Sequence, residues 1–188
     1  MQDIIKFLED INHEMPDHQS ITIERQAYKV DGEHGIKNAC NLSNLKSVDY
    51  FENHLKRGLL YLEFSDLIKQ DEQIKEKVAQ IRESNLPKKL NAEIRKHYYK
   101  VIHKELVDKF KDSLQITTKM VNFLENIPEC FLKNGDYVII IPPIDFNDKS
   151  KAEDIVRFLD ILKSNIRSSL NNQFFNDVKI VPLDVFCK

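Results

Sequence analysis

The feature that most constrains the fold is a continuously apolar segment in the last third of the chain. Residues 137–141 read Tyr-Val-Ile-Ile-Ile, and two prolines, Pro142 and Pro143, follow at once. A strand without any polar position is typical of a sheet that is covered on both faces. Proline ends such a strand because it cannot donate a ladder hydrogen bond. The segment therefore predicts a central strand in a layered α/β domain.

Length and charge limit the organisation of the chain. Its 188 residues match one ordinary domain, and 41% hydrophobic with 31% charged residues is a globular composition. The formal net charge of −2 excludes binding of nucleic acid or membrane by overall charge, so any basic face must be local. We expect residues 1–188 to form a single domain, with residues 67–89 as a helical insertion.

Neither a membrane span nor a secretory signal is expected. A span needs about 20 consecutive apolar residues, far more than any apolar run here, and the first turns carry acids without a cleavage site. The three cysteines, Cys40, Cys130 and Cys187, are odd in number and contain no CxxC pair. This pattern favours a reducing, cytoplasmic location without a membrane partner.

Hydrophobic periodicity predicts the element order α-β-β-β-α-α-β-α-β and a mixed central sheet flanked by helices. The first helix is inferred from the helical spacing of Ile4, Leu8 and Ile11, and the last from a capping box at residues 150–153. The segment 90–126 is either one helix or two. The segment 31–44 is expected to be a loop that is mobile or faces a substrate. The expected helices cover residues 2–14, 67–84, 90–126 and 150–170, and the expected strands cover residues 20–30, 47–53, 58–66, 137–141 and 178–185.

The predicted β-hairpin of residues 47–66 carries two acids. Asp49 lies near the start of its first strand, and Glu63 interrupts an apolar second strand. An ionised carboxylate buried in such a strand needs a partner. Two carboxylates from adjacent strands can hold a hard divalent cation such as Mg²⁺. The alternative is that both acids face solvent on a half-exposed sheet.

This arrangement resembles the PD-(D/E)XK, restriction-endonuclease-like superfamily over roughly residues 1–141. The resemblance rests on Asp49, on Glu63 and on the element order. It implies that both acids are catalytic residues and metal ligands for Mg²⁺. Glu14 or Glu9, on the expected first helix, is then a candidate for the extra carboxylate that some members carry.

The sequence departs from the superfamily motif at its lysine. Ser65 stands two positions after Glu63, where the motif has Lys, and a hydroxyl cannot supply the positive charge of an ammonium. The resemblance implies either a relocated lysine or a degenerate site. Lys109 is the expected catalytic replacement, with Lys104 and Lys46 as alternatives.

A basic stretch, residues 88–111, is the second functional signal. It holds eight Lys or Arg residues against three acids, with Tyr98 and Tyr99 among them. Such a stretch could follow a phosphate backbone, and Lys96, Lys100 and Lys104 are the expected nucleic-acid contacts. The alternative is a solvated helix face with the tyrosines in the core.

Other familiar sites are absent from the sequence. It contains no glycine-rich phosphate loop, no GxSxG motif and no paired metal-ligand cysteines. The expectation is therefore a metal-dependent nuclease-like protein acting on DNA or RNA phosphodiesters, active or catalytically degenerate. The alternative is a non-catalytic interaction protein, or an assembly subunit or homodimer, that binds a protein or nucleic-acid partner.

Overall fold

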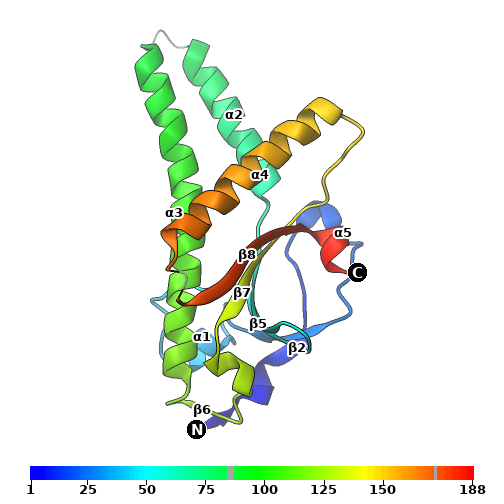
Figure 1. Ribbon diagram of the computed structural model, residues 1–188, viewed down its shortest axis with the longest axis vertical. Coiled ribbons are helices and arrows are strands. Elements are labelled where there is room, and N and C mark those ends of the chain that lie inside the picture. The colour runs from blue at the N-terminus through cyan, green and yellow to red at the C-terminus, as the bar shows by residue number, and fades with distance from the viewer. Residues whose placement is uncertain (84–86, 172) are drawn as a thin grey trace.

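The computed structural model describes residues 1–83, 87–171 and 173–188 and has a mixed α/β architecture. A six-stranded mixed sheet has the order β2-β3-β4-β5-β7-β8, and helices flank it (Figure 1). The predicted mixed central sheet flanked by helices is thereby confirmed. The sheet strands are β2 (Leu8–Asp10), β3 (Gln26–Lys29), β4 (Tyr50–His54), β5 (Gly58–Phe64), β7 (Gly135–Ile141) and β8 (Phe175–Pro182). A separate parallel pair joins β1 (Gln2–Asp3) to β6 (Leu124–Glu125).

The helices include two long ones that connect the halves of the sheet. In Figure 1, α2 and α3 run side by side and extend beyond the sheet, and α4 lies across them. Residues 84–86 of the expected helical insertion lie outside the described residues. The α-helices are α1 (Ile36–Ala39), α2 (Leu67–Glu83), α3 (Lys88–Met120), α4 (Lys149–Ser169) and α5 (Leu183–Phe186), and the 3₁₀ helices are η1 (Ile4–Phe7), η2 (Pro16–His18) and η3 (Glu129–Leu132).

The sheet separates two hydrophobic layers. Strands β2, β3, β4 and β5 pair with one another antiparallel in that order, whereas β5, β7 and β8 run parallel. Tyr61 and Tyr137 belong to the layer that α3 and α4 cover, while Leu62 and Val138 belong to the opposite layer, with residues 11–23 and α5. Every residue of β7 is buried, as the apolar run predicts for a strand covered on both faces.

The predicted N-terminal helix is wrong. Residues 2–14 form β1, the 3₁₀ turn η1 and β2, followed by an extended segment. The spacing of Ile4, Leu8 and Ile11 imitates a helix because the single 3₁₀ turn buries Ile4 and Phe7 together. Beyond β2 the burial alternates, with Ile11 inside and Asn12 outside, which is the period of an extended chain.

The structure also decides several smaller expectations about the helices, the last strand and the helix cap. The expected long helix is one continuous helix, α3, and the expected loop 31–44 contains the short helix α1. The last strand, β8, begins and ends earlier than expected and is followed by α5. Helix α4 is capped by Asp148, whose carboxylate accepts a hydrogen bond from Lys151 N at 3.1 Å, so the predicted capping box is wrong.

Candidate active site at the end of the hairpin

The predicted hairpin is confirmed, and it brings the two acids together. Strands β4 and β5 pair antiparallel up to Tyr50 opposite Leu62, and Asp49 and Glu63 are the next residues, near enough that the Asp49 carboxylate raises the pKa of Glu63. Asp49 N donates a 3.0 Å hydrogen bond to Leu62 O, just beyond the end of the paired register. In return, Phe64 N donates a 2.7 Å hydrogen bond to Asp49 Oδ2. The Asp49 side chain is thus fixed at the end of the strand pair.

Glu63 is the buried carboxylate of the site. It is 2% exposed, on the face of β5 that α3 covers. Its Oε1 accepts a 2.6 Å hydrogen bond from Lys109 Nζ, while Oε2 is buried without any hydrogen-bond partner. A buried acceptor without a partner costs free energy, so Oε2 retains hydrogen-bonding capacity that the described residues do not use.

Helix α3 supplies the cation. Lys109 is mostly buried, and the neighbouring Phe110 holds this part of the helix on the sheet. The Phe110 ring stacks on Tyr137 at 4.8 Å between centroids and meets Tyr61 edge-on at 5.0 Å. Rings packed in this way fix the helix position, so the lysine is set opposite Glu63 by core packing.

The electrostatics of these three residues are coupled. Burial and the nearby Asp49 carboxylate together raise the pKa of Glu63 to about 8, although the Lys109 ammonium acts in the opposite direction. Burial also raises the pKa of Asp49, against the Phe64 N–H and Lys109. Burial lowers the pKa of Lys109, but the Glu63 and Asp49 carboxylates outweigh it and the net shift is upward. The site therefore holds a charged ammonium in contact with Glu63 and near Asp49, two carboxyl groups that resist ionisation.

A hollow of about 350 Å³ opens beside Asp49. Glu14 lines it, whereas Glu9 does not and is bonded to two residues of its wall: Lys29 Nζ donates to Glu9 at 3.0 Å and Tyr50 OH at 3.1 Å. Of the two carboxylates that the sequence left open, Glu14 is thus the one at the site, on an extended segment instead of a helix.

Two further acids of this hollow, Asp31 and Asp66, were missed by sequence reasoning. Asp31 forms an ion pair with Lys37 of α1. The sequence signal that could have identified Asp31 is its position directly before Gly32, in a turn after β3. Asp66 follows the Glu-Phe-Ser segment, where only Ser65 was considered.

The described residues contain no group of three or more His, Cys, Asp or Glu side chains arranged to hold a metal ion. Any ion at Asp49 and Glu63 would therefore complete its coordination with water or substrate oxygens. This is the usual situation for Mg²⁺, which proteins often hold through one or two carboxylates plus substrate phosphates.

The other expected residues lie away from the carboxylates. Lys46 contacts Asp108 at 3.7 Å, so it is not at Glu63. Of the three expected nucleic-acid contacts, Lys100 and Lys104 are exposed on α3, and Lys96 lines a cavity. Ser65 is partly buried, and its hydroxyl lies 3.5 Å from Gln70 Nε2.

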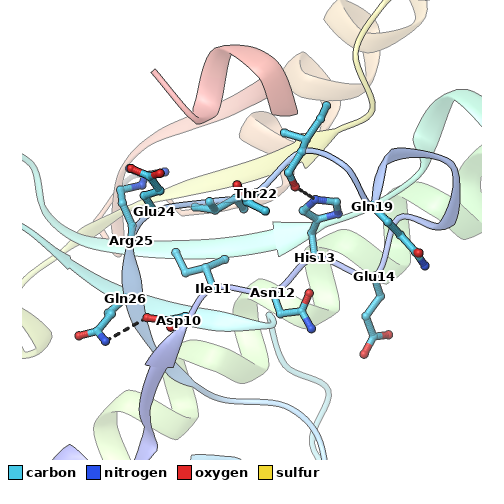
Figure 2. A pocket seen from close by; sticks show the side chains of 12 residues that line it. Asp10, Ile11, Asn12, His13, Glu14, Gln19, Thr22, Glu24, Arg25 and Gln26 are labelled. Carbon is cyan, nitrogen blue, oxygen red and sulfur yellow. Dashed lines mark hydrogen bonds between the residues drawn. The ribbon is translucent and has the colours of Figure 1, made fainter.

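A second hollow, of about 1050 Å³, lies between the chain leaving β2 and the chain entering β3 (Figure 2). Figure 2 shows the His13 ring on one side of its segment, with Nε2 2.6 Å from Ile21 O, and the Glu14 side chain on the other. Glu14 and Asn12 line both hollows, so this segment is the wall between them.

The fold and the site define a mixed α/β protein with a buried carboxylate–lysine cluster at the end of a β-hairpin. No family model, curated protein or solved structure matches the chain. Among the described residues, none of the helices has the length and apolar character needed to cross a membrane.

Proposed function

We propose that the protein is a metal-dependent, nuclease-like hydrolase of nucleic-acid phosphodiesters, with a restriction-endonuclease-like arrangement of its sheet. The observation that carries the proposal is the 2.6 Å contact between Lys109 Nζ and Glu63 Oε1, beside Asp49. It supports a lysine relocated to α3 in place of the motif lysine that Ser65 replaces. The hairpin followed by the parallel strand β7 supports the fold resemblance.

Asp49 and Glu63 would hold the Mg²⁺. Their carboxylate oxygens are the hard donors that this ion prefers, and the partnerless Oε2 of Glu63 offers a free ligand atom. When bound, the ion would supply a water of lowered pKa and neutralise charge on a phosphate.

The residues of the chain have separate roles in this proposal. Lys109 keeps a positive charge next to the carboxylates, where it would stabilise the negative charge that develops on an attacked phosphate. Its bond to Glu63 orients the carboxylate. Asp49 is held in position by the Phe64 N–H. Lys96, Lys100 and Lys104 would contact the phosphate backbone from the exposed side of α3.

The test is titration calorimetry with Mg²⁺ and Mn²⁺ on the wild type, Asp49→Asn and Glu63→Gln. Glu153→Gln, on the exposed surface of α4, is the matched control. We expect metal binding in the wild type and the control and none in the two site variants. Equal binding in all four proteins would show that the carboxylates are not ligands.

Cleavage assays test the role of Lys109 separately from that of the metal. Lys109→Met should abolish cleavage of single- and double-stranded DNA and RNA, and Lys109→Arg should retain part of it because the charge remains. Wild-type levels of cleavage by Lys109→Met would contradict the relocated-lysine proposal.

A second candidate function is that of a non-catalytic interaction protein or assembly subunit. Two observations favour it: Ser65 stands in the lysine position, and Lys109 already occupies Oε1 of Glu63 as an ion pair. Strand β8 is an outer strand of the sheet, where another chain could pair. Absence of cleavage together with a dimer mass in light scattering would support this candidate, whereas cleavage that depends on Glu63 would exclude it.

A further inference from the structure

A cleft of about 1210 Å³ lies between α2, α3 and α4, in the region where α4 crosses the two long helices in Figure 1. Its volume slightly exceeds the usual range of about 300–1,000 Å³ for small-molecule sites. None of the residues that line it belongs to the Asp49–Glu63–Lys109 cluster. The cleft is therefore a separate feature that the proposed catalytic chemistry does not use.

The charge of the cleft is opposite to that of the whole chain. Five Lys or Arg residues and two Asp residues line it, whereas the chain has a formal net charge of −2. Asp71 is already neutralised, because Lys75 Nζ lies 2.7 Å from one oxygen and Tyr99 OH donates to the other at 2.7 Å. Among the described residues, no carboxylate pairs with the remaining cations of the cleft, which are Lys88, Arg95, Lys96 and Arg157.

Aromatic rings lie among these cations. Tyr99 of α3 and Phe158 of α4 are partly exposed, with ring centroids 5.5 Å apart. The Arg95 guanidinium lies 5.7 Å from the centre of the Tyr99 ring. Ile161, also at the cleft, is 57% exposed. Cations beside accessible aromatic surface are the combination that binds the phosphates and bases of a single strand.

The positive charge is spread along the cleft and beyond it. Lys88 and Arg95 are seven residues apart on α3, or about 10 Å along the helix axis. Lys96, Lys100 and Lys104 then follow at four-residue intervals along one exposed side of the same helix, toward the end that carries Lys109. A single phosphate would need converging cations, whereas this extended row matches a chain of phosphates.

We propose that the cleft between α2, α3 and α4 binds single-stranded nucleic acid, with bases on Tyr99 and Phe158 and phosphates on Arg95, Arg157 and Lys96. The choice of nucleic acid among phosphate-bearing polymers rests on the proposed function. Binding at the cleft requires neither the carboxylates nor a metal, so it can be measured without cleavage.

The experiment is fluorescence anisotropy of a short labelled oligothymidylate titrated with the full chain in EDTA. The test variant is Arg95→Glu/Arg157→Glu, and the matched control is Lys56→Glu/Arg57→Glu, two exposed cations in the β4–β5 turn. We expect the test variant to lose affinity by about tenfold or more at low salt, and its slope of log affinity against log salt to fall by about 1.4. The control should bind like the wild type.

A second variant tests the stacking part. Phe158→Leu keeps an apolar side chain and should lose about tenfold in affinity for the oligonucleotide. Equal affinity of wild type and Arg95→Glu/Arg157→Glu would overturn the proposal, as would tight binding of thymidine monophosphate without binding of the oligonucleotide. Wild-type protein that binds the strand in EDTA but cleaves no strand when Mg²⁺ is supplied would count against the proposed function alone.

Discussion

Lys109 of α3 donates a 2.6 Å hydrogen bond to Glu63 of β5, a residue 46 positions earlier in the chain. Both side chains are largely buried: the side chain of Glu63 is 3% exposed and that of Lys109 is 22% exposed. An ion pair in such a place stabilises the fold only as long as both partners are present, because either one alone is a buried charge.

The first prediction is a coupling between these two residues. Above pH 8, where Glu63 of the wild type is ionised and paired with the lysine, Lys109→Met should lower the free energy of unfolding by about 3 kcal/mol, and the double variant Lys109→Met/Glu63→Gln should recover much of this loss. The loss should be smaller below pH 8, where Glu63 keeps its proton. Urea unfolding of the wild type, both single variants and the double variant measures the coupling, and simple additivity would contradict it.

The second prediction concerns stability and pH. Burial and Asp49 raise the pKa of Glu63 from its ordinary value of 4.5 to about 8. The folded protein then keeps a proton that the unfolded chain releases, so this contribution is fully present below pH 4.5 and is lost as pH rises through 8. The loss is at most ~1.4 kcal/mol per pH unit. Glu63→Gln removes it, so the wild type should lose stability relative to this variant between pH 5 and 8 by about that slope. Parallel pH profiles of the two proteins would refute the shifted pKa.

The third prediction links the same proton to the metal. Since Glu63 must lose its proton to act as a ligand, Mg²⁺ binding should release a proton below pH 8 and tighten as pH rises toward that value. Calorimetry in two buffers with different ionisation enthalpies counts the released protons. Binding that is independent of buffer and pH would mean that Glu63 does not bind the ion.

The fourth prediction concerns the packing that positions Lys109. Phe110→Ala should cost about 3–5 kcal/mol, because the ring is fully buried between three aromatic neighbours. Val101→Ala on the same helix, at a position 48% exposed, should change stability by no more than about 0.5 kcal/mol. Chemical unfolding of both variants is the measurement, and similar losses would argue against the described contact of α3 with the sheet.

Local sequence signals predicted the centre of the molecule better than its beginning. The β4–β5 hairpin and the buried strand β7 follow from alternation and from an apolar run, which are local properties. The prediction of an N-terminal helix was wrong because one 3₁₀ turn followed by an extended chain gives an apolar spacing similar to that of a helix. The alternation from Ile11 to Met15 was the signal for the extended form.

The candidate site likewise combines features that local sequence signals predict with features that depend on tertiary packing. The placement of Asp49 beside Glu63 follows from hairpin register, whereas the approach of Lys109 depends on how α3 packs over the sheet. The superfamily resemblance suggested that lysine, and the structure places it beside Glu63. Asp31 and Asp66 were missed because they enter the hollow from loops, whose course is set by tertiary contacts.

The parallel pairing of β5 with β7 has a consequence for how the molecule folds. Glu63 pairs with Ile139, and the helices α2 and α3 lie between these two residues in the sequence. The pairing of β5 with β7 therefore requires the whole intervening chain to fold back onto the sheet. The β4–β5 hairpin can form from neighbouring residues, but the parallel half carries a large loop-closure entropy, which slows folding. We therefore expect the two acids to come together early in folding and Lys109 to reach them later, once the long-range topology has formed.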